Sequence, residues 1–537
     1  MSKPIGIDLG TTFSAITRWE QKIAATGPEV YNIPAEAANT LPSKVFREDD
    51  GDSGSHFIVG RIAQQSGIKE PDAYVNAVKR MMDEGDQSNI KLSGEDFTPI
   101  DISAEIIKVL LQNVEAVEGP NSFVPKGVVV TTPYYFKQHQ NIFTKKAALK
   151  ALKSLYSKRH KDTDSLFLGL LPEPIAAGLD YAFTKAEEGI GNENFLVFDL
   201  GGGTFDVTIF SLDTSDGRVK FEVLAINGDD RLGGEDFDKA LFDWVLQESD
   251  LSLDELNEKD KIRAVRTIEP EITNAKVSLS SMKRTSIIIP YAVGSENIEL
   301  DMTRNDFENI LKGKISSNEN FLSKIEVILD SVLSKANLDA SDINSVLMVG
   351  GSSKIPAIKE IVEDKIGANK TKTIDQMDTA VARGASIYAA FLLDKKLEEE
   401  GKERKYLAIW NEIIIKERTA HQLGIDIDEK FYKIISDNQI TPAQKTIPVS
   451  FKKLSEDKNK VLWDGLTILQ GNKNSNSVIG NVKMPDIYAH GRDASNIKAK
   501  ITFIAESSLI KVRIEVPKSS QDGGDIIVEE DLTLEAK

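Results

Sequence analysis

The hydrophobic pattern of residues 1–393 alternates short apolar runs with longer stretches of helical periodicity. The apolar run Val128 to Val130, for example, is followed by a Lys-rich amphipathic stretch. Such alternation of strands and helices predicts an α/β fold. A final helix is expected from Thr379 to Leu393, and the charged run from Lys395 to Lys405 marks a domain end.

The pattern changes after the apolar patch Ile413 to Ile415. Short runs with strand character, such as 466–469 and 510–516, are separated there by polar turns. This pattern predicts an all-β domain. We therefore expect an α/β domain, a linker and an all-β domain, with the boundaries 1–404, 405–418 and 419–537.

Composition narrows the function classes. A chain of 537 residues exceeds what one hydrophobic core organises. The net charge of -18 disfavours a nucleic-acid partner, which needs a basic surface. The sequence has no cysteine, which excludes disulfides, zinc-thiolate sites and cysteine nucleophiles. With no apolar segment typical of a signal peptide or a membrane helix, we expect a cytoplasmic protein without a membrane partner.

An internal repeat points to a ligand site. The segment Ile7 to Phe13 recurs in altered form at Phe198 to Phe205, so the α/β region consists of two related halves. In each copy an apolar strand ends near an Asp, Asp8 or Asp199, and a turn of Gly and Thr residues follows. Glycine lets backbone amides approach an anion, and carboxylates suit a hydrated magnesium ion. Two copies in register predict a phosphate site between the halves.

A third glycine element runs from Val346 to Pro356: an apolar strand, a Gly pair and a helix start with Pro near its first turn. A helix start of this kind can hold ribose or phosphate, although such a turn is often only structural. The chain has no Gly-x-x-x-x-Gly-Lys-Ser/Thr loop, which argues against a P-loop enzyme.

These three elements, in this order, resemble the seventy-kilodalton heat-shock (DnaK, heat shock protein 70) chaperone family. Further segments are similar to the family pattern: Val75 to Arg80, Pro172 to Leu179, Ile226 to Asp238 and Ala275 to Ser280. The resemblance implies an actin-like ATPase domain with two lobes over 1–404, a linker over 405–418 and a β-sandwich peptide-binding domain over 419–537.

The resemblance also implies roles for particular residues. It implies catalytic roles for Lys79, Glu173, Asp199 and Thr204. Asp8 and Asp199 would bind magnesium through water, beside ATP or ADP, with potassium as a further family cofactor. Nucleotide contacts are implied for Gly10, Thr11, Thr12, Phe13, Gly201, Gly202, Gly203, Thr204, Gly228, Lys276, Ser280, Gly350, Gly351, Ser352, Lys354 and Asp378.

Several positions depart from the family pattern. Asp464 and Val449 stand where the family places apolar residues of the peptide pocket, and an unpaired carboxylate there would weaken the binding of apolar side chains. Thr273 replaces an adenine-side glutamate, which predicts reduced nucleotide affinity. The family's acid-flanked leucine linker is similar to Glu412 to Glu417, where Lys416 intrudes.

Partner contacts are also affected. Asn141 and the region of Gly169 replace family arginines, so contact with a J-domain cochaperone is not expected. The chain ends at Lys537 directly after the β domain, which predicts that the helical lid is absent and that bound peptide exchanges quickly. Between Ala147 and Pro172 the chain is longer than the family pattern and adds a basic amphipathic stretch, which is either a solvated face or a partner site. Its basic residues are Lys150, Lys153, Lys158, Arg159 and Lys161.

The resemblance favours an ATP-dependent chaperone, which hydrolyses ATP and binds extended or unfolded polypeptide, with a nucleotide-exchange factor as a further expected partner. The alternative is a regulatory chaperone, which uses ATP binding as a switch to bind one dedicated partner with little hydrolysis. A small-molecule kinase on the same ATPase fold is a third hypothesis, which the all-β domain disfavours.

Overall fold

A computed structural model provides the fold. It describes residues 2–531 except 22–25, 50, 52–53, 84–88, 121, 189–191, 215–217, 255, 294–295, 316–318, 374–376, 408–409, 411, 428, 451–453, 457, 459–465, 472–475, 483–492, 494–497, 506–509 and 517–525. The chain divides into two compact units, residues 1–134 with 143–414 and residues 135–142 with 415–537. Asp464 lies outside the described residues.

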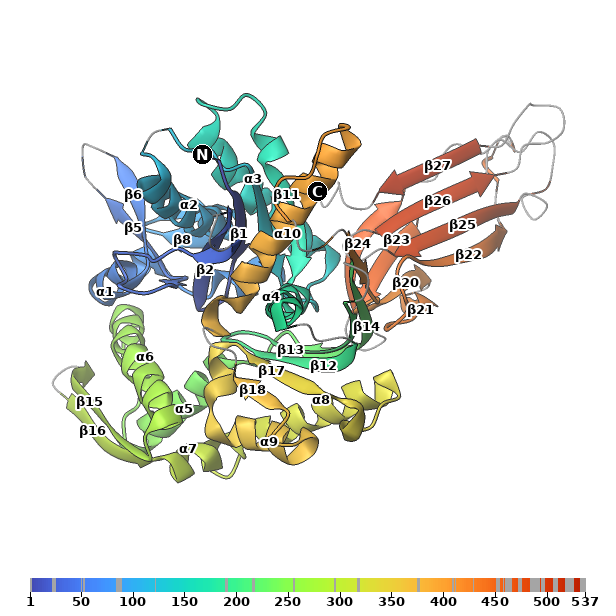
Figure 1. Ribbon diagram of the computed structural model, residues 1–537. Helices are drawn as coiled ribbons and strands as arrows, with labels where there is room; N and C mark the ends of the chain where they lie inside the picture. The colour runs from blue at the N-terminus through green and yellow to red at the C-terminus, as the bar shows by residue number, and fades with distance from the viewer. Residues whose placement is uncertain are drawn as a thin grey trace. The chain divides into compact units, whose positions relative to one another are not determined.

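Residues 4–416 contain two sheets of six strands each, which supports the sequence repeat (Figure 1). The first sheet has the order β11 (Phe167–Pro172), β10 (Gly127–Thr132), β1 (Pro4–Asp8), β2 (Phe13–Gln21) and β3 (Thr26–Val30), with β4 (Leu41–Pro42) beside β2. The second has the order β18 (Thr371–Thr373), β17 (Ser345–Val349), β12 (Glu193–Leu200), β13 (Phe205–Asp213), β14 (Arg218–Asp229) and β19 (Glu412–Lys416).

The two sheets share one topology. Strands β1 and β12 each form an antiparallel hairpin with the next strand along the chain and pair in parallel with a strand on the other side. These central strands are apolar and fully buried, as in Ile5, Ile7 and Phe195 to Phe198, because both faces of such sheets are covered by helices. We call residues 4–172 the first half and residues 193–373 the second half.

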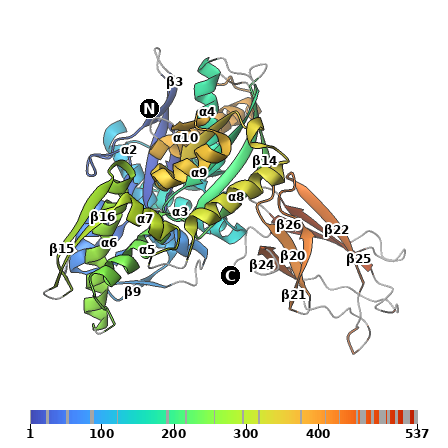
Figure 2. The same cartoon turned by 90° about the horizontal axis from the view of Figure 1, so that it is seen from below.

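The described residues contain ten α-helices. They are α1 (Arg61–Lys69), α2 (Pro99–Glu118), α3 (Gln138–Tyr156), α4 (Glu173–Glu188), α5 (Gly234–Glu248), α6 (Glu258–Ser281), α7 (Arg304–Leu311), α8 (Phe321–Ala336), α9 (Pro356–Ile366) and α10 (Met377–Glu399). Of these, α2, α4, α8, α9 and α10 contact strands of the two six-stranded sheets. Helix α8 packs on β13 and β14 (Figure 2). The predicted helix from Thr379 to Leu393 is confirmed as part of α10, which continues to Glu399.

Helix α10 packs closely on β1 and on α4 (Figure 1). A Cβ on Gly384 would lie 1.8 Å from the Ala176 carbonyl oxygen, and one on Gly6 would lie 2.3 Å from the Ser386 nitrogen. Any larger residue at Gly6 or Gly384 would push the backbones apart. This close contact fixes α4, which begins at Glu173, against the sheet that carries Asp8.

Three smaller sheets or hairpins complete the first unit. They are β5 (Val45–Asp49) with β6 (Ser55–Val59) and β7 (Tyr74–Val75), β8 (Ile90–Leu92) with β9 (Glu95–Phe97), and β15 (Arg284–Val293) with β16 (Glu296–Thr303). The 3-10 turn η3 (Val78–Asp83) follows β7 and carries Lys79.

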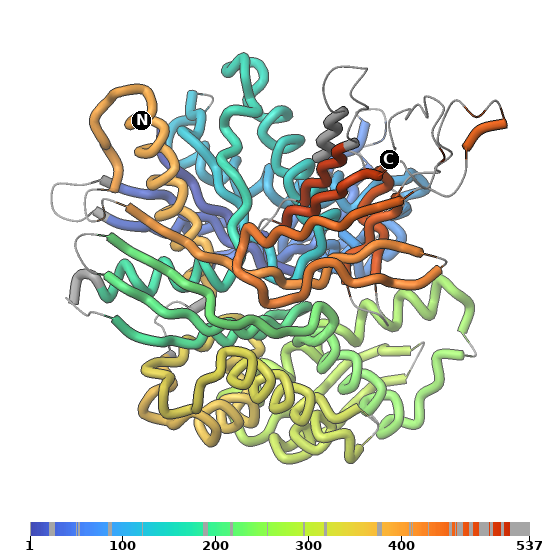
Figure 3. The backbone as a smooth tube through the Cα atoms, turned by 90° about the vertical axis from the view of Figure 1, so that its right-hand side faces the viewer, coloured from blue at the N-terminus to red at the C-terminus, as the bar shows by residue number. Residues whose placement is uncertain are grey.

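The described part of residues 419–537 contains strands and no helix, so the all-β prediction is confirmed for it (Figure 3). One sheet has the order β21 (Lys430–Ile435), β20 (Gln422–Ile427), β23 (Leu466–Gly471) and β24 (Asn476–Val482). The other has the order β22 (Ala443–Ser450), β25 (Lys498–Ala505), β26 (Ile510–Val516) and β27 (Ile526–Asp531). Residues of both sheets share one apolar core, and Val449 packs against it.

Candidate functional site

The first glycine turn joins β1 to β2. Asp8 ends β1, and a Cβ on Gly10 would lie only 1.9 Å from the Phe13 carbonyl oxygen, so this turn requires glycine. The Gly10 N–H donates to Ser14 Oγ over 3.2 Å, and Ser43 Oγ donates to the Gly10 carbonyl over 2.8 Å. These bonds fix the turn in one conformation.

The second glycine turn joins β12 to β13 and rests on the start of α5. The Gly201 N–H donates to the Thr204 carbonyl over 3.1 Å and closes the turn. The Gly234 N–H donates to the Gly201 carbonyl over 3.0 Å, and the Glu235 N–H donates to the Gly202 carbonyl over 2.8 Å. The second turn is therefore held by the first N–H groups of a helix, which have no partner within the helix.

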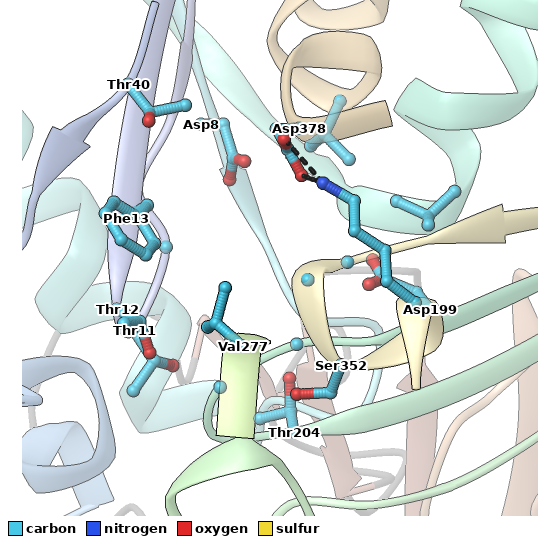
Figure 4. A pocket seen from close by; sticks show the side chains of 18 of the residues that line it. Asp8, Thr11, Thr12, Phe13, Thr40, Asp199, Thr204, Val277, Ser352 and Asp378 are labelled. Carbon is cyan, nitrogen blue, oxygen red and sulfur yellow. Dashed lines mark hydrogen bonds and ion pairs between the residues drawn. The ribbon is translucent and has the colours of Figure 1, made fainter. Parts of the chain in front are cut away.

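A cavity of about 620 Å³ lies between the two turns and has the size of a small-molecule site. Figure 4 shows Thr11, Thr12 and Phe13 on one side of it and Ser352 and Asp378 on the other. Most of the predicted site residues line it: Asp8, Gly10, Thr11, Thr12, Phe13, Lys79, Glu173, Asp199, Gly201, Gly202, Thr204, Lys276, Ser280, Gly350, Gly351, Ser352, Lys354 and Asp378.

Two predicted residues lie outside this lining. Gly203 is buried behind the second turn, where a Cβ would lie 2.7 Å from Thr11 Oγ1. Gly228 lies in β14 and pairs with Asp206 of β13, one strand away from the central strand β12. Both glycines therefore act on the cavity only through their neighbours.

Lys79 and Glu173 form a buried ion pair at the cavity. Lys79 Nζ donates to Glu173 Oε1 over 2.5 Å, and the two residues are 5% and 7% exposed. Glu173 is the first residue of α4, directly after β11, so the strand-to-helix junction sets its position. The pair supplies one donor and one acceptor within reach of a bound ligand.

Asp8 and Asp199 bring negative charge to the same cavity. Burial, with repulsion from Glu173, raises the pKa of Asp8 from 3.8 to about 7, against the attraction of Lys79 and a 3.1 Å hydrogen bond from Thr131 Oγ1. Burial also raises the pKa of Asp199, and repulsion from Glu173, Asp206 and Asp8 adds to the shift. A bound cation would relieve this repulsion, because it favours the charged carboxylates.

The opposite wall combines α6 with the third glycine element. Lys276 Nζ donates to Asp238 Oδ2 over 2.7 Å and to the Gly234 carbonyl over 2.8 Å, and Thr273 Oγ1 donates to the same Asp238 oxygen over 3.1 Å. Asp238 thus binds two of the α6 side chains that line the cavity, Lys276 and Thr273. Thr273, which stands where the family pattern has a glutamate, therefore hydrogen-bonds to Asp238.

The third element has the predicted strand, Gly pair and helix. Gly350 has φ +82, and a Cβ there would lie 2.4 Å from the Leu200 carbonyl oxygen, so β17 and the second turn approach each other only because residue 350 is glycine. Pro356 begins α9. Lys354 Nζ donates to both carboxylate oxygens of Asp378 at 2.8 Å, across the cavity wall (Figure 4).

Sequence reasoning missed several residues of the site. Thr40, Val277 and Val381 line the cavity, and Thr131 donates to Asp8 from the end of β10. None of them belongs to a glycine motif. Strands β1 and β10 are parallel neighbours, so their carboxyl ends lie at the same edge of the sheet. The position of Thr131 near the end of the apolar run 128–130 was the only sequence signal that it lies near Asp8.

A family model described as Hsp70 protein matches residues 4–536. The chain belongs to the Hsp70 family. The prediction of the family is therefore confirmed, and membership supports a chaperone of the Hsp70 kind. Family members are ATPases, and they bind ATP or ADP with Mg²⁺, unfolded polypeptides and cochaperones. Among the described residues of this Hsp70, no helix is long and apolar enough to cross a membrane.

The residues of this Hsp70 fit a hydrated magnesium ion. Asp8 and Asp199 are two buried carboxylates that line one cavity, and Mg²⁺ takes one or two protein carboxylates while it keeps several waters. The ion would neutralise charge on the phosphate oxygens of a bound nucleotide. The Thr131 hydrogen bond would orient the Asp8 carboxylate toward it.

Proposed function

We propose that this Hsp70 is a DnaK-type chaperone of the cytoplasm, which hydrolyses ATP in the cavity between the two halves and couples hydrolysis to binding of extended polypeptide. The observation that carries the proposal is the meeting of the Lys79–Glu173 pair with Asp8 and Asp199 in one cavity bounded by both glycine turns. Phosphoryl transfer needs mainly positioning and neutralisation of charge, and these groups supply both.

In this proposal each part of the site has one task. Asp8 and Asp199 would hold the hydrated magnesium, and the two turns, with Thr204, would bind phosphate oxygens. Glu173 would accept a proton from, or orient, the attacking water, and Lys79 would stabilise the charge that develops. Lys276, Ser280, Lys354 and Asp378 would enclose the adenosine.

The second unit would bind the polypeptide. Ile427 and Tyr432, on the β20–β21 hairpin, are 41% and 48% exposed, which supports contact with apolar side chains. Strand edges of a sandwich can add an extended peptide by main-chain hydrogen bonds. The domain boundaries 1–404, 405–418 and 419–537 remain part of the proposal.

Single-turnover ATP hydrolysis, with and without a model apolar peptide, tests the proposal. We expect hydrolysis by the full chain and a faster rate with peptide. Hydrolysis that peptide does not change would contradict the coupling. Tight ATP binding without hydrolysis would favour the switch hypothesis instead, and transfer of labelled γ-phosphate to a small alcohol would favour a kinase.

A further inference from the structure

Arg80 reaches from the first half into the second. It follows Lys79 in η3, and its guanidinium contacts the second glycine turn and the start of α5 together. Arg80 Nη2 donates to the Gly203 carbonyl over 2.9 Å and to Asp236 Oδ2 over 2.5 Å, and Nη1 donates to Asp236 Oδ1 over 3.2 Å. One side chain thus joins the turn that carries Lys79 to the second glycine turn and to α5.

Asp236, the carboxylate that Arg80 binds, also caps α5. Its Oδ2 accepts from the Gly233 N–H over 2.8 Å, one residue before the helix begins. Because the Gly234 and Glu235 N–H groups hold the carbonyls of Gly201 and Gly202, this helix start already supports the second turn. Arg80 adds the contact with the third carbonyl of that turn, at Gly203.

Gly203 is the point where three segments meet. A Cβ at this position would lie 2.7 Å from Thr11 Oγ1 and 2.8 Å from Arg80 Nε. Thr11 belongs to the first turn, Gly203 to the second and Arg80 to η3, so the contact joins both halves. Gly203 and Arg80 are not among the described residues that line the cavity, so the junction lies behind it.

We propose that Arg80 is a positioning residue for ATP hydrolysis, which holds the second glycine turn in register with Lys79. The inference rests on the proposed ATPase function. Arg80 acts through the turn, because it does not itself line the cavity. A planar guanidinium can donate to both oxygens of Asp236 and to the Gly203 carbonyl at once, which the single ammonium of lysine does less well.

Loss of Arg80 therefore loosens the second glycine turn relative to Lys79. Because a displacement of about 1 Å in a reacting geometry can cost about 100-fold in rate, we expect the single-turnover rate of Arg80→Ala to fall ~10- to 100-fold. ATP affinity should fall less than the rate. Arg80→Lys should recover part of the rate, because it retains a charge beside Asp236.

The test uses the full chain as wild type, Arg80→Ala, Arg80→Lys and Asp236→Asn. Asp236→Asn removes the nearer of two carboxylate charges beside Arg80, the other being Glu235 at 3.4 Å, and keeps an oxygen that can accept from the Gly233 N–H. Arg231→Ala is the matched control, because the Arg231 side chain is 81% exposed and its ion pair with Asp83 is as long as 3.9 Å. The readouts are single-turnover rate, ATP and ADP affinity by calorimetry, and hydrogen exchange of the 201–204 amides without nucleotide.

We expect faster exchange at 201–204 and slower hydrolysis in Arg80→Ala and Asp236→Asn, an intermediate Arg80→Lys, and an unchanged control. Unchanged exchange and rate in both Arg80→Ala and Asp236→Asn would overturn the inference. If Arg80→Ala does not fold, Arg80→Lys and Asp236→Asn decide it. If the wild type binds ATP without hydrolysis, the proposed function is contradicted. Hydrogen exchange of the 201–204 amides in Arg80→Ala then shows separately whether Arg80 holds the second glycine turn.

Discussion

Lys79 Nζ lies 2.5 Å from Glu173 Oε1, although 94 residues separate the two in the chain. Lys79 comes from η3 and Glu173 from the first position of α4. The two close-packed glycines Gly6 and Gly384 hold α10 against both β1 and α4, so the pair is fixed relative to Asp8. The proposed catalytic donor and acceptor are thereby set in place before a ligand binds.

Glu173→Gln should lower the single-turnover rate of ATP hydrolysis about 100-fold, because the amide cannot accept a proton from water as a carboxylate does. The double variant Lys79→Ala/Glu173→Gln should be little slower than the slower single variant, since groups that act as a unit are not additive. Quench-flow measurement of all three variants checks this. Losses that multiply would show that the two side chains act independently.

The buried pair of Asp180 and Arg383 should be important for stability. Arg383 Nε and Nη2 donate to the two oxygens of Asp180 over 2.8 and 2.6 Å. The pair joins α10 to α4. Asp180→Ala removes the carboxylate from a buried arginine and should lower the free energy of unfolding by about 3–5 kcal/mol. Urea unfolding measures this. Asp330→Ala, in a surface pair with Lys365, is the control and should cost less than about 1 kcal/mol.

The pH dependence of stability should contain a contribution from Glu235. Burial raises the pKa of Glu235 from 4.5 to about 7, against the attraction of Arg80. The folded chain therefore keeps a proton that the unfolded chain releases, and its stability falls as the pH rises through this window. In Glu235→Gln this fall should be smaller, by on the order of 1 kcal/mol between pH 4.5 and 7.

Urea unfolding of the nucleotide-free chain at several pH values checks this contribution. Glu248→Gln is the matched control, because Glu248 is exposed near the end of the same helix. Equal pH dependence in wild type and Glu235→Gln would contradict the prediction. A change in the control as large as that in Glu235→Gln would do the same.

Asp394 should anchor the segment that follows α10. Its carboxylate is fully buried and accepts from the N–H groups of Lys405, Tyr406 and Leu407 over 2.7, 2.9 and 2.7 Å. Asp394→Ala leaves these N–H groups without that acceptor and should cost about 2–4 kcal/mol. Asp394→Asn, with one remaining acceptor oxygen, should cost less. Thermal unfolding of both variants is the measurement, and equal losses would contradict the account.

The sequence predicted the parts of the site that local chemistry specifies. Glycine and threonine after a strand that ends near an Asp gave the turns at Gly10 and Gly202, and the resemblance gave Lys79 and Glu173. It could not predict partners that only the fold brings together. Arg80 meets Asp236 across 156 residues, and Arg383 meets Asp180 across 203.

The sequence also could not predict which residues after α10 are buried. The domain end that the charged run after Leu393 favoured stays a prediction, while the structure extends α10 to Glu399 and buries Tyr406, Leu407 and Trp410. Their burial depends on Asp394 and on Trp19 of β2, whose Nε1 donates to the Tyr406 carbonyl over 2.9 Å. Composition does not reveal the Asp394 contacts, because they join α10 to residues 405–407 across the charged run that separates them in the chain.

In the proposed function, the cavity between the halves hydrolyses ATP by means of Lys79. The most direct test is single-turnover hydrolysis by Lys79→Ala, with ATP affinity measured on the same protein and exposed Lys359→Ala as the control. We predict a rate ~100- to 1,000-fold below wild type, with ATP still bound. A rate equal to that of wild type would contradict the account.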